Sequence, residues 1–104
     1  MAQFDVYLNP DLLQRERTPY LLDVQNSFLE RLVTRVVVPL RRAEHAPLPM
    51  RELNPALELQ GQALVLDTAA LAAIPARGLG QPVASLRGQS GDLISALDVL
   101  FGGY

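Results

Sequence analysis

The sequence predicts a mainly β fold, in which a strongly bent antiparallel sheet or partly open barrel carries one α-helix at its C-terminal end. Short segments that alternate in polarity or are rich in β-branched residues, separated by turn residues, indicate strands. The end of the chain has the period of an amphipathic helix instead. Strands and helices do not alternate along the chain, which argues against a parallel α/β sheet.

The first half of the chain predicts three strands. Residues 3–8 alternate between apolar and polar side chains and predict a half-buried strand, and residues 20–25 predict a second strand. The side chains expected to face the core are Phe4, Val6, Leu8, Tyr20, Leu22 and Val24. The β-branched residues 34–38 predict a central strand, which we expect to end at Pro39. Residues 41–50 contain two prolines and predict an exposed connection.

The second half begins with a hairpin signal. Gly61 separates the strand-like residues 57–60 and 62–66, which predicts a β-hairpin with its turn at this glycine. Residues 67–74 are compatible either with a helix, because of their alanine and leucine content, or with a turn followed by a strand. Residues 83–86 predict a last short strand.

Residues 92–101 predict the terminal amphipathic helix. Its apolar residues recur at i, i+1, i+4, i+7 and i+8: Leu93, Ile94, Leu97, Leu100 and Phe101. We expect Ser90 to cap this helix and Asp92 to lie in its first turn. The residues that follow are Gly102, Gly103 and Tyr104. They predict a rigid, exposed tip that suits contact with a partner better than catalysis.

The composition limits the class of protein. A chain of 104 residues predicts one domain, residues 1–104, whose thin core favours oligomerisation. The absence of cysteine favours a reducing compartment, and with no signal peptide and no long apolar stretch we expect a cytoplasmic protein without a membrane span. The net charge of −2 and the lack of a basic face argue against direct nucleic-acid binding.

Few residues suit catalysis or metal binding. His45 is the only histidine, so we interpret it as a surface residue rather than a catalytic base, and we expect no metal and no cofactor. Arg41 and Arg42 are compatible with a phosphate clamp, but solvated charge is the more common role of such a pair. The apolar pair Phe28–Leu29 is equally compatible with an exposed contact and with packing in the core.

Several segments resemble the CcdB toxin family, in the same order and over nearly the whole chain. Residues 3–7 (Q-F-D-V-Y) resemble the family's Q-F-x-V-Y opening, and residues 22–25 (L-D-V-Q) resemble its V-D-V-Q strand. Residues 36–40 (V-V-V-P-L) are similar to its V-I-P-L strand, and residues 51–55 (R-E-L-N-P) to its R-E-L-x-P segment. Residues 101–104 (F-G-G-Y) stand where the family has F-W-G-I.

The resemblance implies a non-enzymatic toxin of a type II toxin–antitoxin module. It implies a homodimer with an SH3-like barrel and a C-terminal helix, which enters the cavity of the DNA gyrase A subunit and traps the cleavage complex of this topoisomerase. A CcdA-like antitoxin would neutralise the toxin, and the pair would repress its own operon, with operator DNA contacted only through the antitoxin, as in plasmid maintenance. Two alternatives stay open: an mRNA-cleaving ribonuclease toxin on the same fold, and a member that has lost gyrase poisoning.

The resemblance also implies which residues contact gyrase. They form the apolar pair after the second strand and the end of the helix: Phe28, Leu29, Asp98, Phe101, Gly102, Gly103 and Tyr104. This favours the exposed alternative for Phe28–Leu29. Three of these positions depart from the family pattern, because Gly102 replaces a tryptophan, Asp98 an asparagine, and Tyr104 an aliphatic residue.

Overall fold

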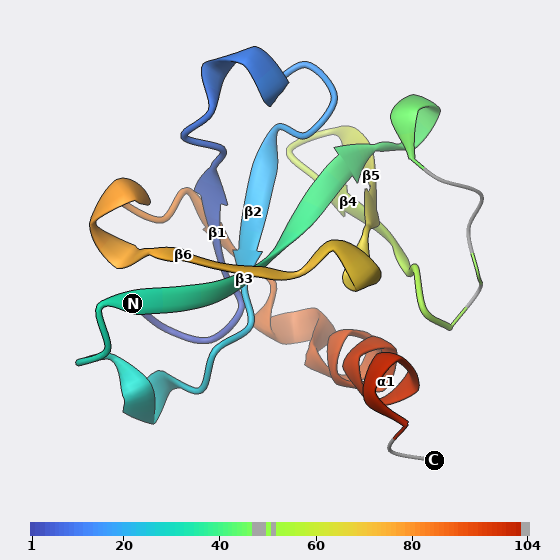
Figure 1. Ribbon diagram of the computed structural model, residues 1–104. Helices are drawn as coiled ribbons and strands as arrows, with labels where there is room; N and C mark the ends of the chain where they lie inside the picture. Colours follow the sequence, from blue (N-terminus) through green and yellow to red (C-terminus); the bar gives the residue numbers. More distant parts are fainter. Residues whose placement is uncertain (47–49, 51, 103–104) are drawn as a thin grey trace.

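A computed structural model describes residues 1–46, 50 and 52–102. Within these residues one seven-stranded antiparallel sheet has the strand order β4-β5-β3-β2-β1-β7, and β6 also pairs with β3. The strands are β1 (Asp5–Leu8), β2 (Tyr20–Asp23), β3 (Thr34–Arg42), β4 (Ala56–Leu59), β5 (Gln62–Leu66), β6 (Ala72–Pro75) and β7 (Ala84–Ser85). The helix α1 (Ser90–Phe101) lies below the sheet (Figure 1). The predicted mainly β fold with a C-terminal helix is confirmed.

Strand β3 gives the sheet its curvature. Along one edge it pairs with β2, while along the other it pairs first with β6 and then with β5. In Figure 1 this strand starts at the left, bends at the centre of the molecule and rises to the right. Because two different strands share one edge of β3 and diverge from it, the sheet curls into a half-barrel.

The prediction that Pro39 ends the central strand is wrong, because β3 continues to Arg42. Proline lacks the N–H that a ladder hydrogen bond requires. The pairing of β3 with β6 ends at Val37 and the pairing with β5 begins at Leu40, so Pro39 lies between the two partner strands. Its carbonyl still accepts a hydrogen bond from the Asp67 amide at 3.0 Å. The proline is therefore tolerated at the one gap in this edge of β3.

The hairpin predicted at Gly61 is confirmed. Gln60 and Gly61 have φ values of +50° and +77°, so both central residues of the turn adopt the left-handed conformation that suits a two-residue hairpin. Residues 67–74 follow the turn-plus-strand alternative, because the 3₁₀ turn η4 (Thr68–Ala70) precedes β6. The connection expected over residues 41–50 starts later, since Arg41 and Arg42 belong to β3 and the turn η3 (Ala43–His45) follows them.

The sheet buries side chains on both of its faces. The main core lies between the sheet and α1, and it includes Phe4, Val6, Tyr20, Leu22, Val38, Leu40, Leu57, Leu59, Leu64, Leu66, Leu86, Leu93 and Ala96. A second, smaller core on the opposite face contains Tyr7, Leu21, Val37 and Leu79. This corrects the expectation that β1 is half-buried. Tyr7 is fully buried, because the segment after β6 places Leu79 over the second face. Leu8, which was expected to face the core, is 42% exposed.

Helix α1 buries a narrower stripe than the sequence predicted. Leu93 and Ala96 are fully buried, whereas Ile94 is 47% and Phe101 70% exposed. Those two exposed residues are seven positions apart and share the outer face of the helix. Part of the apolar face that periodicity assigned to the core therefore faces solvent.

The start of α1 also differs from the expectation. The helix begins at Ser90 itself, and the preceding Gln89 makes no side-chain capping hydrogen bond, so Ser90 is not the cap. Asp92 lies in the first turn, as predicted, where a carboxylate interacts favourably with the helix dipole. No helix in the described part of the chain is long and apolar enough to cross a membrane.

We expect Leu93→Ala to lower the free energy of unfolding by about 2–5 kcal/mol, because it leaves a cavity in the main core. Urea denaturation followed by circular dichroism measures this loss. The matched control is Ile94→Ala on the same helix, which removes an exposed side chain and is expected to cost less than about 1 kcal/mol. Equal losses for the two variants would contradict the buried face described here.

Candidate functional site

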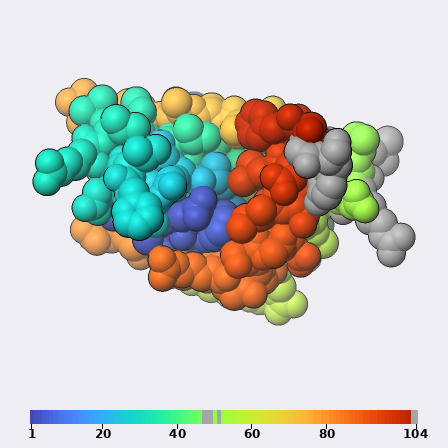
Figure 2. Space-filling view, turned by 90° about the horizontal axis from the view of Figure 1, so that it is seen from below, coloured from blue at the N-terminus to red at the C-terminus, as the bar shows by residue number. Residues whose placement is uncertain are grey.

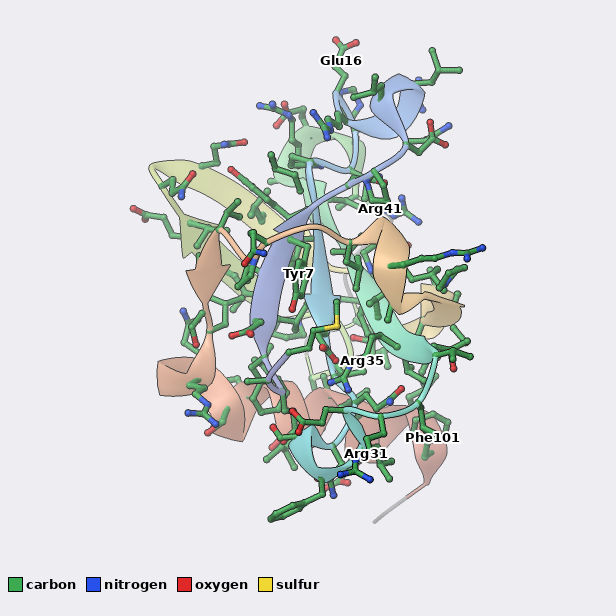
Figure 3. The ribbon with its side chains drawn as sticks, turned by 90° about the vertical axis from the view of Figure 1, so that its left-hand side faces the viewer. Tyr7, Glu16, Arg31, Arg35, Arg41 and Phe101 are labelled. Atoms are coloured by element: carbon green, nitrogen blue, oxygen red, sulfur yellow. The ribbon has the colours of Figure 1, made fainter. Side chains whose placement is uncertain are left out.

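Two segments that carry exposed apolar side chains lie on one side of the molecule. The 3₁₀ turn η2 (Ser27–Leu29) and the helix α1 both face the viewer in Figure 2, with the first residues of the chain between them. Figure 3 agrees, because Arg31, which follows η2, and Phe101 lie at the same end of the molecule. This arrangement places on one side of the molecule two segments that are about 70 positions apart in the sequence.

Turn η2 presents the pair Phe28–Leu29 to solvent. Phe28 is 93% exposed and Leu29 is 47% exposed, so the exposed alternative for this pair is confirmed. The turn is held locally by Asn26, whose side-chain Oδ1 accepts a hydrogen bond from the Phe28 amide at 2.9 Å. This hydrogen bond holds the main chain of the turn, while the phenyl ring itself makes little contact with the protein.

Sequence reasoning missed two neighbours of this pair. Leu32 and Val33 are 51% and 82% exposed, so four large apolar residues within six positions face solvent. The signal was the repetition of an apolar pair across Glu30 and Arg31. Val33 also lines a shallow groove of about 490 Å³ together with Thr34, Pro75, Ala76 and Arg77, which extends the apolar surface along the ends of β3 and β6.

The end of α1 supplies the second segment. Asp98 is exposed on the same face of the helix as Phe101, and Gly102 ends the helix in the left-handed conformation with a φ of +75°. The Gly102 amide donates a hydrogen bond to the Asp98 carbonyl, which fixes the last turn. Gly103 and Tyr104, which the resemblance also implied as contacts, lie outside the described residues. We call Phe28, Leu29, Asp98, Phe101 and Gly102 the contact surface.

The first residues of the chain fix the two segments relative to each other. The Gln3 amide donates to Ser27 Oγ at 2.9 Å, and the Gln3 side chain donates to the Val24 carbonyl at 3.1 Å. The Phe4 carbonyl accepts a hydrogen bond from the Leu86 amide, shortly before α1. Phe4 is buried with a φ of +70°, a conformation that costs energy in a non-glycine residue. The strained residue therefore lies at the junction between η2 and α1.

A buried ion pair lies under η2. Arg35 Nε donates to Asp23 Oδ2 at 2.8 Å and Arg35 Nη2 donates to Asp23 Oδ1 at 2.9 Å, and neither side chain is exposed to solvent. Burial raises the pKa of Asp23, against the opposing effects of the Gln25 amide and of Arg35. Burial likewise raises the pKa of the Tyr7 hydroxyl. The Asp23 and Arg35 side chains are structural, because their complete burial keeps them out of contact with a ligand.

The other residues considered for chemistry are exposed or take part in structural contacts. His45 is exposed in η3, as interpreted from the sequence. Arg41 is not free solvated charge, because its Nε donates to Asp67 Oδ2 and its Nη1 to Thr18 Oγ1, both at 2.6 Å. Among the residues with described positions, no three His, Cys, Asp or Glu side chains are grouped so that they could hold a metal ion. The arrangement suits binding of another macromolecule through apolar side chains.

Comparison with known proteins points to one family. The family model described as "CcdB protein" matches residues 3–103, almost the entire chain, and so confirms the resemblance found in the sequence. The search of curated proteins found no match.

We expect Asp23→Asn to change how stability depends on pH. Because burial holds the pKa of Asp23 above its ordinary value of 3.8, the folded protein binds this proton more tightly than the unfolded chain does. The contribution of the protonated carboxyl to stability is therefore full below the ordinary pKa and is lost as pH rises through the folded-state pKa.

Urea unfolding of the wild type and the variant between about pH 4 and pH 7 measures this difference. The free energy of unfolding of the wild type, relative to that of the variant, is expected to fall as pH rises. A relative stability that increases with pH would mean that Arg35 outweighs the effect of burial.

Proposed function

Because the chain belongs to the CcdB family, we propose that it is a toxin that poisons DNA gyrase by binding the A subunit through the contact surface. Family membership implies the toxin of a toxin–antitoxin system, and toxins of this family are known as gyrase poisons rather than enzymes. The observation that carries the proposal is the exposure of Phe28 in η2 and of Phe101 in α1, two segments that lie on the same side of the molecule (Figure 2). A cytoplasmic place of action follows, since gyrase acts on chromosomal and plasmid DNA.

The proposed mechanism needs binding energy and no chemical step. Burying an exposed phenylalanine or leucine side chain in a partner contributes roughly 1.5–3 kcal/mol. Aromatic anchors at the centre of an interface commonly carry most of its binding energy. Gly102 offers no ring where the family has a tryptophan, so the aromatic anchor within α1 is Phe101. A toxin bound in this way would hold gyrase in the state in which the DNA is cleaved.

A homodimer belongs to the same proposal. Gyrase A is itself a dimer with a twofold cavity, and a twofold toxin dimer would present two copies of the contact surface to it. The small core of the chain supports association with a second copy. We infer further that a cognate antitoxin neutralises the toxin and that operator DNA is contacted only through the antitoxin, in keeping with a net charge of −2.

We expect Phe28→Ala and Phe101→Ala each to weaken binding to gyrase A by about 30-fold, the effect of losing an aromatic anchor worth about 2 kcal/mol. Isothermal titration calorimetry measures the affinity, and an assay for linear DNA from gyrase cleavage complexes measures poisoning. In each variant we expect poisoning to fall by the same factor as the affinity for gyrase A.

The matched control is Leu13→Ala. Leu13 is 92% exposed in the turn η1 (Leu12–Gln14), which lies at the end of the molecule opposite to η2 and α1 (Figure 1). This variant is expected to keep full affinity and poisoning. Equal effects at all three positions would refute the contact surface, and rapid mRNA loss without cleavage complexes would favour the ribonuclease alternative.

We expect the purified protein to have twice the mass of one chain in size-exclusion chromatography with light scattering. The dimer should persist in the Phe101→Ala variant if this residue contacts gyrase rather than the second copy. A mass equal to that of one chain at micromolar concentration would contradict the twofold arrangement.

A further inference from the structure

Gln25 extends the sheet beyond the end of β2. Strand β2 ends at Asp23, while β3 continues alongside to Thr34. The side-chain Oε1 of Gln25 accepts a hydrogen bond from the Val36 amide at 3.0 Å, and so takes the place of a backbone carbonyl that β2 no longer supplies. The Gln25 side chain thus satisfies a backbone donor of β3 where the neighbouring strand has turned away.

The other end of the same carboxamide reaches η2. Gln25 Nε2 donates a hydrogen bond to the carbonyl of Leu29, the last residue of the turn, at 3.3 Å. The main-chain N–H of Gln3 donates to the Oγ of Ser27, the first residue of the turn. Two glutamine residues therefore tether η2 at its two ends, and Gln25 connects it to the interior of the sheet.

The buried ion pair holds Gln25 itself in place. The main-chain N–H of Gln25 donates to Asp23 Oδ1 at 3.0 Å, and its main-chain carbonyl accepts a hydrogen bond from Arg35 Nη2 at 3.2 Å. Gln25 is only 8% exposed, so water competes weakly for these bonds. Hydrogen bonds therefore hold both the main chain and the side-chain carboxamide of Gln25 in one orientation.

We propose that Gln25 is a positioning residue for the Phe28–Leu29 pair, transmitting the rigidity of the Asp23–Arg35 ion pair to η2. The inference rests on the proposed function, in which this pair binds gyrase. Phe28 is almost wholly exposed and so cannot be oriented by its own packing. Its direction depends on the backbone of η2, and a turn that is already ordered loses less conformational entropy on binding.

The test is Gln25→Met, which keeps the length of the side chain and removes both of its hydrogen bonds. We expect amide exchange at Leu29, whose N–H donates to the Asn26 carbonyl within η2, to accelerate about tenfold. Affinity for the purified gyrase A subunit should weaken by a similar factor. In a Phe28→Ala background the same change should weaken affinity by less than about twofold, because the side chain that it positions is gone.

The matched control is Gln62→Met, the same substitution in the β4–β5 hairpin, where the Gln62 side chain donates to the Tyr20 hydroxyl at 3.2 Å. It should leave both exchange at Leu29 and gyrase affinity unchanged. If Gln25→Met does not fold, Gln25→Glu replaces it, because a carboxylate still accepts from the Val36 amide and cannot donate to the Leu29 carbonyl.

The outcomes separate this inference from the proposed function. Unchanged exchange at Leu29 overturns the positioning role, and so does an equal loss of affinity in the presence and absence of Phe28. Faster exchange at Leu29 together with a wild type that does not bind gyrase A refutes the proposed function, while the tether of η2 to Gln25 stands.

Discussion

The η2 part of the contact surface depends on one buried ion pair, Asp23–Arg35. Two charges without contact to water are tolerated because both oxygens of the carboxylate accept bonds from the guanidinium. Removing one partner of such a pair typically costs about 3–5 kcal/mol, since the other charge remains buried. The pair joins β2 to β3 at the point where the chain leaves the sheet for η2. Gln25, which bonds to both members of the pair and to the Leu29 carbonyl, therefore connects the ion pair to the surface turn η2.

The ion pairs of Arg35 and Arg41 build structure, and the proposed function assigns recognition to exposed apolar side chains. Arg41 binds Asp67 and Thr18, and Arg35 binds Asp23, so four charged groups that a catalytic mechanism would need are committed to the sheet. Phe28, in contrast, rests on a short capped turn and is free to enter a partner. Such a division suits a protein that acts by occupying another macromolecule.

The two halves of the contact surface are supported in different ways. Phe101 stands on a regular helix that is anchored by the burial of Leu93 and Ala96. Phe28 stands on a turn that owes its position to side-chain hydrogen bonds. The strained backbone of Phe4 lies between the two segments: the neighbouring Gln3 amide bonds to Ser27 of η2, and the Phe4 carbonyl bonds to Leu86 shortly before α1.

The sequence by itself determined what depends on local periodicity and local turn chemistry. It predicted the strands along the chain other than β6, the hairpin at Gly61, the terminal helix and the exposure of the pair Phe28–Leu29, the last through the family's motifs. Only the tertiary structure decided that Pro39 lies inside a strand, that Tyr7 is buried and that Asp23 meets Arg35. Each of these outcomes depends on a segment distant in the sequence, namely a second strand along one edge of β3, a loop that covers the sheet, or a neighbouring strand in register. Periodicity within one segment carries no information about such partners, because burial and pairing are properties of the assembled sheet.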